Sequence, residues 1–330
     1  MKIRFLMPVS ILSVSLFSCV EAASFVAKAP ARNAYQENTS LTNSLIEYAK
    51  SRTPVLEESS PDYVYSPLAD YCAGLIAKGF KGNSSYFNEF KSVVETLNLN
   101  YDSFCLSCQG AFASNIEIEK SVQEAMNQSY VTTFVGNDAA VKNGLREFYG
   151  RDIPVAYDTA SLSIVDVVDY FKEPLKVEGY EYFQEPEGAK QYDSLLTYSE
   201  LGYEVDDLFS KVRIQIQETV LSILVPEDGY EFSPSSLLTW NGVEGKARIK
   251  LPELSVSKSA TFNDELGRPY VAQDSTFAFS RFGTVAKSAH RNTDVLAMDD
   301  YDFQLSVSKP FYFALSFHDV PLFIGHVSHI

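Results

Sequence analysis

The chain has 330 residues, of which 45% are apolar and 13% aromatic. This composition supplies a large hydrophobic core and excludes a disordered or low-complexity protein. Acidic residues outnumber basic ones by 43 to 27, which gives a net charge of −16. A nucleic-acid backbone or an anionic membrane surface would be repelled, so we expect no nucleic-acid partner. No Pro-, Gly- or Ser-rich linker divides the chain, which favours a single domain.

The first 22 residues have the composition of an export signal. Lys2 and Arg4 form a basic start, residues 5–17 are mostly apolar, and Val20-Glu21-Ala22 places small residues where a signal peptidase cuts. The apolar run is shorter than the about 20 residues that a membrane-spanning helix needs. We expect cleavage after Ala22, no integral membrane segment in residues 23–330, and a secreted location, extracellular or periplasmic.

The cysteines allow one internal bridge in the mature chain. Cys19 lies in a stretch that resembles a bacterial lipoprotein motif, but Phe17 is bulky for that motif, so lipid attachment is the less favoured alternative. Cys72, Cys105 and Cys108 remain after cleavage, the last two as a C-x-x-C pair. No histidine follows at zinc-finger spacing, and no thioredoxin-like pattern surrounds the pair. We expect a Cys105–Cys108 disulfide or free thiols.

Helices are predicted in the N-terminal third of the chain. Apolar residues at helical spacing behind Thr39 and Ser40 predict a helix that ends near Arg52. Residues 63–65 form a short strand, and Ser66-Pro67 begins a second helix that closes at Gly79 and Gly82. A third helix runs from residue 83 to about 97.

From Met126 the pattern changes to extended structure. Residues 130–135 predict a strand, 138–149 a helix, 153–157 a strand and 159–171 a further helix. The last helix is predicted from apolar residues that would share one face: Leu162, Val165, Val168 and Phe171.

The C-terminal half is mostly strand. Residues 212–216 and 220–225 predict a hairpin, and residues 247–251 another strand. Residues 311–317 and 322–327 form a closing pair joined by a turn at 318–321. This order gives an α+β fold, in which an N-terminal helical cluster packs on mixed or antiparallel sheets.

Several segments, collinear along the chain, resemble the serpin family. The run Tyr63-Val64-Tyr65-Ser66-Pro67-Leu68, with the helix end at 77–83, is similar to the family's strand that leads into Ser-Pro-Leu. Residues 222–229 and 249–254 resemble two later strands with Leu-Pro or Val-Pro turns. Residues 309–327 resemble the closing hairpin, Pro-Phe-x-Phe followed by Leu-Phe-x-Gly-x-Val. The resemblance implies a serpin-like domain over residues 23–330.

Two stretches depart from the family's pattern. A polar, cysteine-bearing stretch, 103–119, stands where a helix usually follows the third one, and residues 177–183 lack the Asn-Ala and Trp of a long central strand. All four histidines lie in the last 41 residues, without cysteine or acidic partners at ligand spacing, so we expect surface or structural roles and no metal.

The resemblance implies a mechanism that depends on a long exposed loop. A protease cuts an inhibitory serpin in this loop and becomes attached to the loop through an acyl bond. The protease is then distorted as the loop inserts into the main sheet. Here residues 285–290 resemble the structure before the loop, and 18 residues separate them from Lys309. The acidic run 299–302 replaces the small residues of an insertable hinge, and a strand at 303–308 takes up much of the rest. We expect a truncated loop that does not trap.

Two functions remain open. An inhibitor of a serine or cysteine protease would present a scissile bond among the reactive-loop candidates, which are Ala297, Met298, Asp299, Asp300, Tyr301, Asp302 and Phe303. The alternative is a non-inhibitory binding or structural protein on the same scaffold, with another protein as its partner. No hydrolase, metalloprotease or nucleotide-binding motif occurs, so we expect neither an enzyme nor a cofactor.

Overall fold

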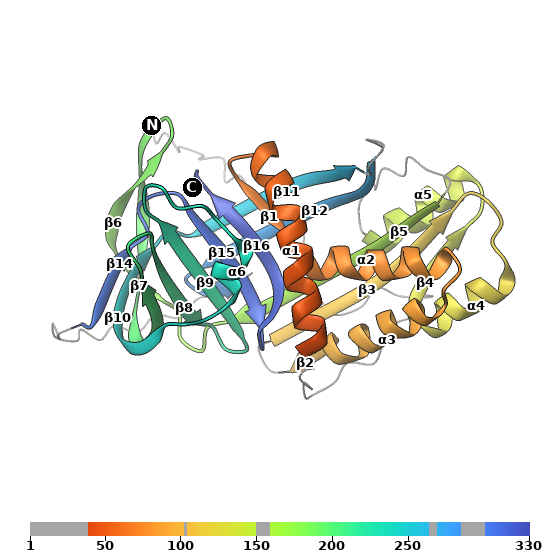
Figure 1. The fold of residues 1–330 in the computed structure, drawn as a ribbon, viewed down its shortest axis with the longest axis horizontal. Helices are drawn as coiled ribbons and strands as arrows, with labels where there is room; N and C mark the ends of the chain where they lie inside the picture. The colour runs from red at the N-terminus through yellow and green to blue at the C-terminus, as the bar shows by residue number, and fades with distance from the viewer. Residues whose placement is uncertain (1–38, 102–103, 150–158, 264–268, 285–300) are drawn as a thin grey trace, which may run out of the picture.

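The computed structural model describes residues 39–101, 104–149, 159–263, 269–284 and 301–330 (Figure 1). Within these ranges two β-sheets lie side by side, and the helices gather mainly on the first of them. In Figure 1 the second sheet occupies the left half of the molecule, while helices α2 to α5 and strands β3 to β5 occupy the right half. The predicted α+β class is confirmed.

The N-terminal elements follow the prediction closely. They are α1 (Thr39–Ser59), β1 (Tyr63–Tyr65), α2 (Pro67–Phe80) and α3 (Ser85–Leu97). Ser66 caps α2, since its hydroxyl accepts a hydrogen bond from the Ala69 amide at 3.2 Å. Helix α1 runs past its predicted end at Arg52 and through Pro54, because Thr53 and Leu56 are buried and their packing outweighs the missing proline N–H.

The first sheet has seven strands in the order β11-β12-β13-β5-β3-β2, with β4 beside β3. Its strands are β2 (Leu99–Tyr101), β3 (Phe104–Ser114), β4 (Val131–Val135), β5 (Thr159–Tyr170), β11 (Leu254–Asn263), β12 (Pro269–Ser280) and β13 (Gly283–Thr284). Helices α4 (Lys120–Gln128) and α5 (Asp138–Tyr149) flank β4, and α5 packs on β3 as well.

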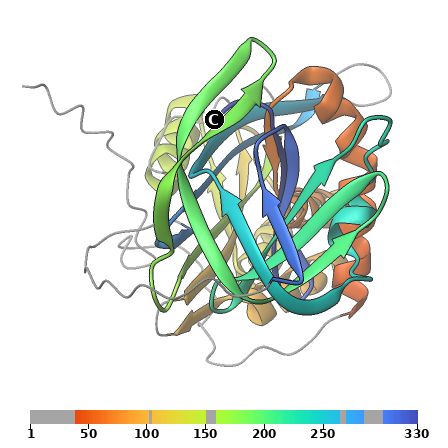
Figure 2. The ribbon, with the colours of Figure 1, turned by 90° about the vertical axis from the view of Figure 1, so that its left-hand side faces the viewer.

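The second sheet has nine strands in the order β1-β16-β15-β9-β8-β7-β10-β14, and β6 pairs with β7 at the side. Its further strands are β6 (Lys176–Glu185), β7 (Gly188–Val205), β8 (Phe209–Gln215), β9 (Thr219–Pro226), β10 (Val243–Leu251), β14 (Phe303–Ser306), β15 (Phe311–Phe317) and β16 (Val320–Val327). The short helix α6 (Pro234–Leu238) packs on β9 and β15. Both predicted hairpins are confirmed. In Figure 2 this sheet faces the viewer, with the β6–β7 hairpin projecting at the top.

One prediction in the middle of the chain is wrong, and strand β3 was not predicted. Residues 159–171 form strand β5 and not a helix, because β-branched residues fill this segment and β3 pairs with it over eleven residues. The polar stretch 103–119 contains strand β3, whose even-numbered residues Phe104, Leu106 and Cys108 are buried. Helix α4 is an element that the sequence reading missed, and the strand predicted at 153–157 lies outside the described residues.

The main core lies between the two sheets and under helices α2 and α3. Aromatic side chains connect the sheets directly: the rings of Phe104 and Phe317 stack with centroids 5.0 Å apart, and those of Phe277 and Phe313 with centroids 4.4 Å apart. Helix α2 contacts β3 and β5 of the first sheet and β16 of the second. The two sheets therefore share one hydrophobic core.

Candidate functional site

Among the described residues, the first sheet has only the short strand β13 between β12 and β5. Only the two residues of β13 pair with both strands, Thr284 with Phe279 and Asp169, and Gly283 with Ser280 and Tyr170. In the described part of the chain, β5 and β12 form no backbone pairs with each other. We call their two facing edges the strand slot. Unpaired strand edges carry free N–H and C=O groups and accept an added strand.

Gly283 fixes the end of the strand slot. Its φ angle is +123°, a conformation that strongly favours glycine, and a Cβ atom built there would lie 2.3 Å from the carbonyl oxygen of Asp169. The backbone before it is tied down as well, since the Phe171 amide donates to the Phe282 carbonyl at 2.9 Å. The tight turn between β12 and β13 thus places β13 between β12 and β5.

Asp169 joins this end of the slot to the second sheet. Its carboxylate oxygen Oδ2 accepts hydrogen bonds from the backbone amides of Gln217, Glu218 and Thr219, at 3.2, 3.0 and 2.7 Å, and from the Thr219 hydroxyl at 2.7 Å. These donors form the turn between β8 and β9. Burial raises the pKa of Asp169, and the four hydrogen bonds oppose that shift without cancelling it. Thr284 of β13 donates its hydroxyl to the Asp169 carbonyl at 3.3 Å.

The side of the slot that faces the core changes from apolar to polar along its length. Thr284, Asp169 and Phe279 are opposite one another and buried, so every second residue from them faces inward. On β5 these residues are first Val167 and Val165, which pack against the core, and then Ser163 and Ser161. The slot is therefore apolar near β13 and lined by hydroxyl groups farther along.

The far end of the predicted loop is anchored in the second sheet. The Asp302 amide donates to the Lys246 carbonyl at 2.8 Å, and the Lys246 amide donates to the Asp302 carboxylate at 2.9 Å. The Phe303 ring stacks on Tyr203 with centroids 4.9 Å apart, and β14 runs parallel to β10. Eighteen residues lie between Thr284 and Phe303.

The structure thus separates the reactive-loop candidates. Asp302 and Phe303 belong to the anchor, Tyr301 directly precedes them, and Ala297, Met298, Asp299 and Asp300 lie outside the described residues. Residues 285–290, which the sequence reading placed before the loop, also lie outside the described residues, and the preceding strand β12 ends at Ser280. The described residues end at Thr284 and resume at Tyr301.

The predicted Cys105–Cys108 bridge is not formed. Residues three apart on a strand face opposite sides, and Cys108 faces the core whereas Cys105 is half-exposed. The Cys108 thiol is free and lies 3.5 Å from the thiol of Cys72 on α2. The sequence reading missed this pair because 36 residues separate its members.

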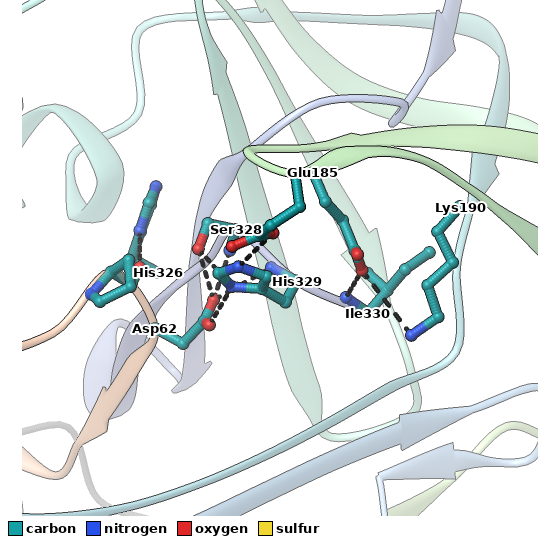
Figure 3. Close-up of polar contacts among 9 residues, drawn as sticks. Asp62, Glu185, Lys190, His326, Ser328, His329 and Ile330 are labelled. Carbon is teal, nitrogen blue, oxygen red and sulfur yellow. Dashed lines mark hydrogen bonds and ion pairs between the residues drawn. The ribbon is translucent and has the colours of Figure 1, made fainter.

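A polar cluster holds the end of the chain against the start of β1 (Figure 3). Asp62 accepts hydrogen bonds from the amides of Ser328 and His329 and from the Ser328 hydroxyl at 2.9 Å. His329 Nδ1 lies 2.5 Å from Asp62 Oδ2 and 2.8 Å from Ser328 Oγ. A hydrolytic triad needs serine and aspartate on opposite nitrogens of the imidazole ring, so this cluster is a structural contact.

The titrating groups of this cluster stabilise one another. The hydrogen bond to Asp62 raises the pKa of His329. Burial acts to raise the pKa of Asp62, but the hydrogen bonds from Ser328 and His329 outweigh it and lower the pKa. His326 has a lowered pKa because it is buried, and one of its ring nitrogens contacts the Pro61 carbonyl. Among the described residues, no group of three His, Cys, Asp or Glu side chains has the arrangement of a metal site.

None of the helices in the described ranges is long and apolar enough to cross a membrane. No protein-family model and no curated protein matches the sequence.

Solved serpin structures, in contrast, match the fold over nearly the whole chain. A highly specific serpin of the insect Tenebrio molitor has a TM-score of 0.71 at 13% identity, covering 90% of this chain and all of its own. Human thyroxine-binding globulin in complex with thyroxine has a TM-score of 0.71 at 12% identity, covering 88% of this chain and 98% of its own. Tengpin, a thermophilic serpin in its native state, has a TM-score of 0.68 at 13% identity over 92% and 97%. The fold implied by the collinear sequence segments is confirmed.

Proposed function

We propose that this chain, which has a divergent serpin-like fold, is exported without residues 1–22 and works as one domain, residues 23–330, that binds other proteins without trapping proteases. In this proposal a protease cut between β13 and β14 is not followed by full insertion of the cut segment into the strand slot. The observation that carries the proposal is the register that β13 sets for the residues after it.

The register defines which residues would fill the slot. If the chain continued from Thr284 in the same antiparallel pairing, residues 283–294 would lie opposite 159–170 on β5 and 269–280 on β12. Since Thr284 faces inward, every second residue after it would do so too. These inward positions are Ala286, Ser288, His290, Asn292 and Asp294.

The inward positions divide into a compatible and an incompatible group. Ala286 and Ser288 are small and would lie opposite Val167 and Val165 of β5. Asp294 would bring a carboxylate under the sheet, and neither β5 nor β12 contains a basic residue that could pair with it. Burial of an unpaired charge costs several kcal/mol, and the His290 and Asn292 side chains would also lose hydration. Insertion beyond Ser288 therefore brings little stabilisation, and a trap needs a large one.

The test is limited proteolysis with serine and cysteine proteases, followed by denaturing gels and thermal unfolding of the cut protein. We expect cleavage between β13 and β14 without an adduct that survives boiling in detergent, and a melting temperature of the cut protein close to that of the intact one. A variant with H290T, N292A and D294T should show a higher melting temperature after cleavage, because all its inward positions are small. A detergent-stable adduct with the unmodified chain would refute the proposal.

The second candidate is a trapping inhibitor of a serine or cysteine protease. It is favoured by the two edges of the strand slot, which are unpaired in the described part of the chain, and by small residues from β13 onward: Gly283, Thr284, Ala286 and Ser288. The same experiment separates the two candidates, because trapping requires both the adduct and a strong rise in melting temperature after cleavage.

A further inference from the structure

We propose that Cys72 and Cys108 form a disulfide when the chain folds in an oxidising environment, and that this bond fastens helix α2 to the first sheet. The inference depends on the packing of α2 against β3 and is independent of what the segment between β13 and β14 does.

The geometry brings two buried thiols into contact. The Sγ atoms of Cys72 and Cys108 are 3.5 Å apart, while the side chains are 0% and 1% exposed. A disulfide needs its sulfurs about 2.05 Å apart, so a shift of roughly 1.5 Å closes the bond. Cys72 lies on the face of α2 that contains Leu68, Leu75 and Ile76, all of which pack in the same core as Cys108. The thiols of two cysteines, one on helix α2 and one on strand β3, thus lie next to each other in the core.

The reaction requires an external oxidant, for which a low-molecular-weight disulfide such as oxidised glutathione is sufficient. One cysteine thiolate attacks the external disulfide, forms a mixed disulfide and releases one glutathione. The second thiolate attacks the protein sulfur of that mixed disulfide, forms the Cys72–Cys108 bond and releases the second glutathione. The two protein thiols lose two protons and two electrons, and the external disulfide is reduced to two thiols.

Burial determines when the bond can form. The contact with Cys108 and the burial of the site raise the pKa of Cys72, so the folded protein contains little of the reactive thiolate. The exchange therefore proceeds while α2 and β3 are docking, and the closed bond is afterwards shielded from reductants. The closed loop contains α3 and β2, and its β3 end lies beside β5, one wall of the strand slot.

The experiment maps the bond in the full chain. The protein is refolded with reduced and oxidised glutathione at pH 8, its free thiols are alkylated under denaturing conditions, and a chymotryptic digest is analysed by mass spectrometry without reduction. We expect a Cys72 peptide linked to a Cys108 peptide, two hydrogen masses below the sum of the free peptides. Recovery of both cysteines as alkylated thiols, or a link between Cys108 and Cys105, would overturn the inference.

Two variants separate this bond from other pairings. Cys105→Ser should retain the Cys72–Cys108 link, whereas Cys72→Ala should lose it and leave Cys108 open to alkylation. Reductant should lower the melting temperature of Cys105→Ser by about 5 °C or more and leave that of Cys72→Ala unchanged. An equal response of the two variants would contradict a stabilising bond at this position.

Discussion

At the scale of single residues, Asp169 is the position where the two sheets depend on one another. One of its carboxylate oxygens accepts from three backbone amides of the β8–β9 turn, which is partly buried. The same residue pairs with Thr284 at the end of the strand slot. Asp166, three residues earlier on β5, faces the other side of the sheet, and burial alone raises its pKa.

We expect Asp169→Ala to lower the free energy of unfolding by about 3 kcal/mol, because it leaves four donors without their acceptor. The measurement is urea denaturation at pH 7. Asp166→Asn is the matched control on the same strand, and it should be neutral or stabilising because it removes a buried charge. Equal destabilisation by the two variants would show that Asp169 has no special role in joining the sheets.

The Asp166 variant also has a predicted pH dependence. A carboxyl whose pKa is raised by folding contributes stability below its unfolded pKa, about 3.9, and loses that contribution as the pH rises through the folded value. Asp166→Asn should therefore gain stability relative to the original chain as the pH rises from 3 to 7. Urea midpoints that stay equal at both pH values would contradict the shift.

At the scale of elements, the sequence predicted the N-terminal helices and both hairpins of the second sheet well and the strands of the first sheet poorly. Strand β5 is covered on both faces, by α5 over Ala160 and Leu162 and by the core under Val165 and Val167. Apolar residues therefore occur at both odd- and even-numbered positions of β5, and their spacing also fits a helix. The strand slot could not be predicted either. It is defined by β5 and β12, which lie about 110 residues apart in the sequence and do not pair with each other in the described residues.

The last strand, β16, ends in a contact whose strength depends on pH. The raised pKa of His329 means that its ion pair stabilises the fold below the unfolded value, about 6.5, and that this contribution is lost as the pH rises through the folded value. The lowered pKa of Asp62 means that its contribution is present above about 3.9 and is lost as the pH falls through the folded value. The contact is thus strongest between these two limits.

We expect Asp62→Asn to return the pKa of His329 towards 6.5, because the substitution removes the charge that stabilises the imidazolium. Histidine titration by NMR measures it directly. Asp319→Asn, in the turn at the other end of the β15–β16 hairpin, is the control and should leave the His329 titration unchanged. A His329 pKa that does not move in Asp62→Asn would exclude the ion pair.

At the scale of the whole molecule, the net charge of −16 opposes folding through repulsion among like charges. The chain also has exposed ion pairs, for example Arg248 with Glu178 and Lys309 with Glu227, at 2.5 Å each. Exposed pairs contribute at most about 1 kcal/mol each and are weakened by salt. We expect the overall repulsion, which salt also weakens, to be the larger effect.

Raising the NaCl concentration from about 10 to 150 mM shortens the Debye length from about 30 to 8 Å. We expect the melting temperature to rise by about 2 °C or more over this range, because each degree needs only a few tenths of a kcal/mol in a chain of this size. Choline chloride at the same ionic strength should give the same rise. A fall in melting temperature would mean that local ion pairs outweigh the repulsion.

The position of the C-terminal hairpin has one further consequence. Strands β15 and β16 lie inside the second sheet, between β9 and β1, while β14 lies at its edge on β10. A single backbone cut between β13 and β14 would therefore sever the chain without freeing its last thirty residues, which would stay in place through non-covalent contacts, mainly sheet hydrogen bonds and buried aromatic rings. The two fragments of the cut protein would stay associated. They would therefore be measured as one mass in native solution and as two masses under denaturing conditions.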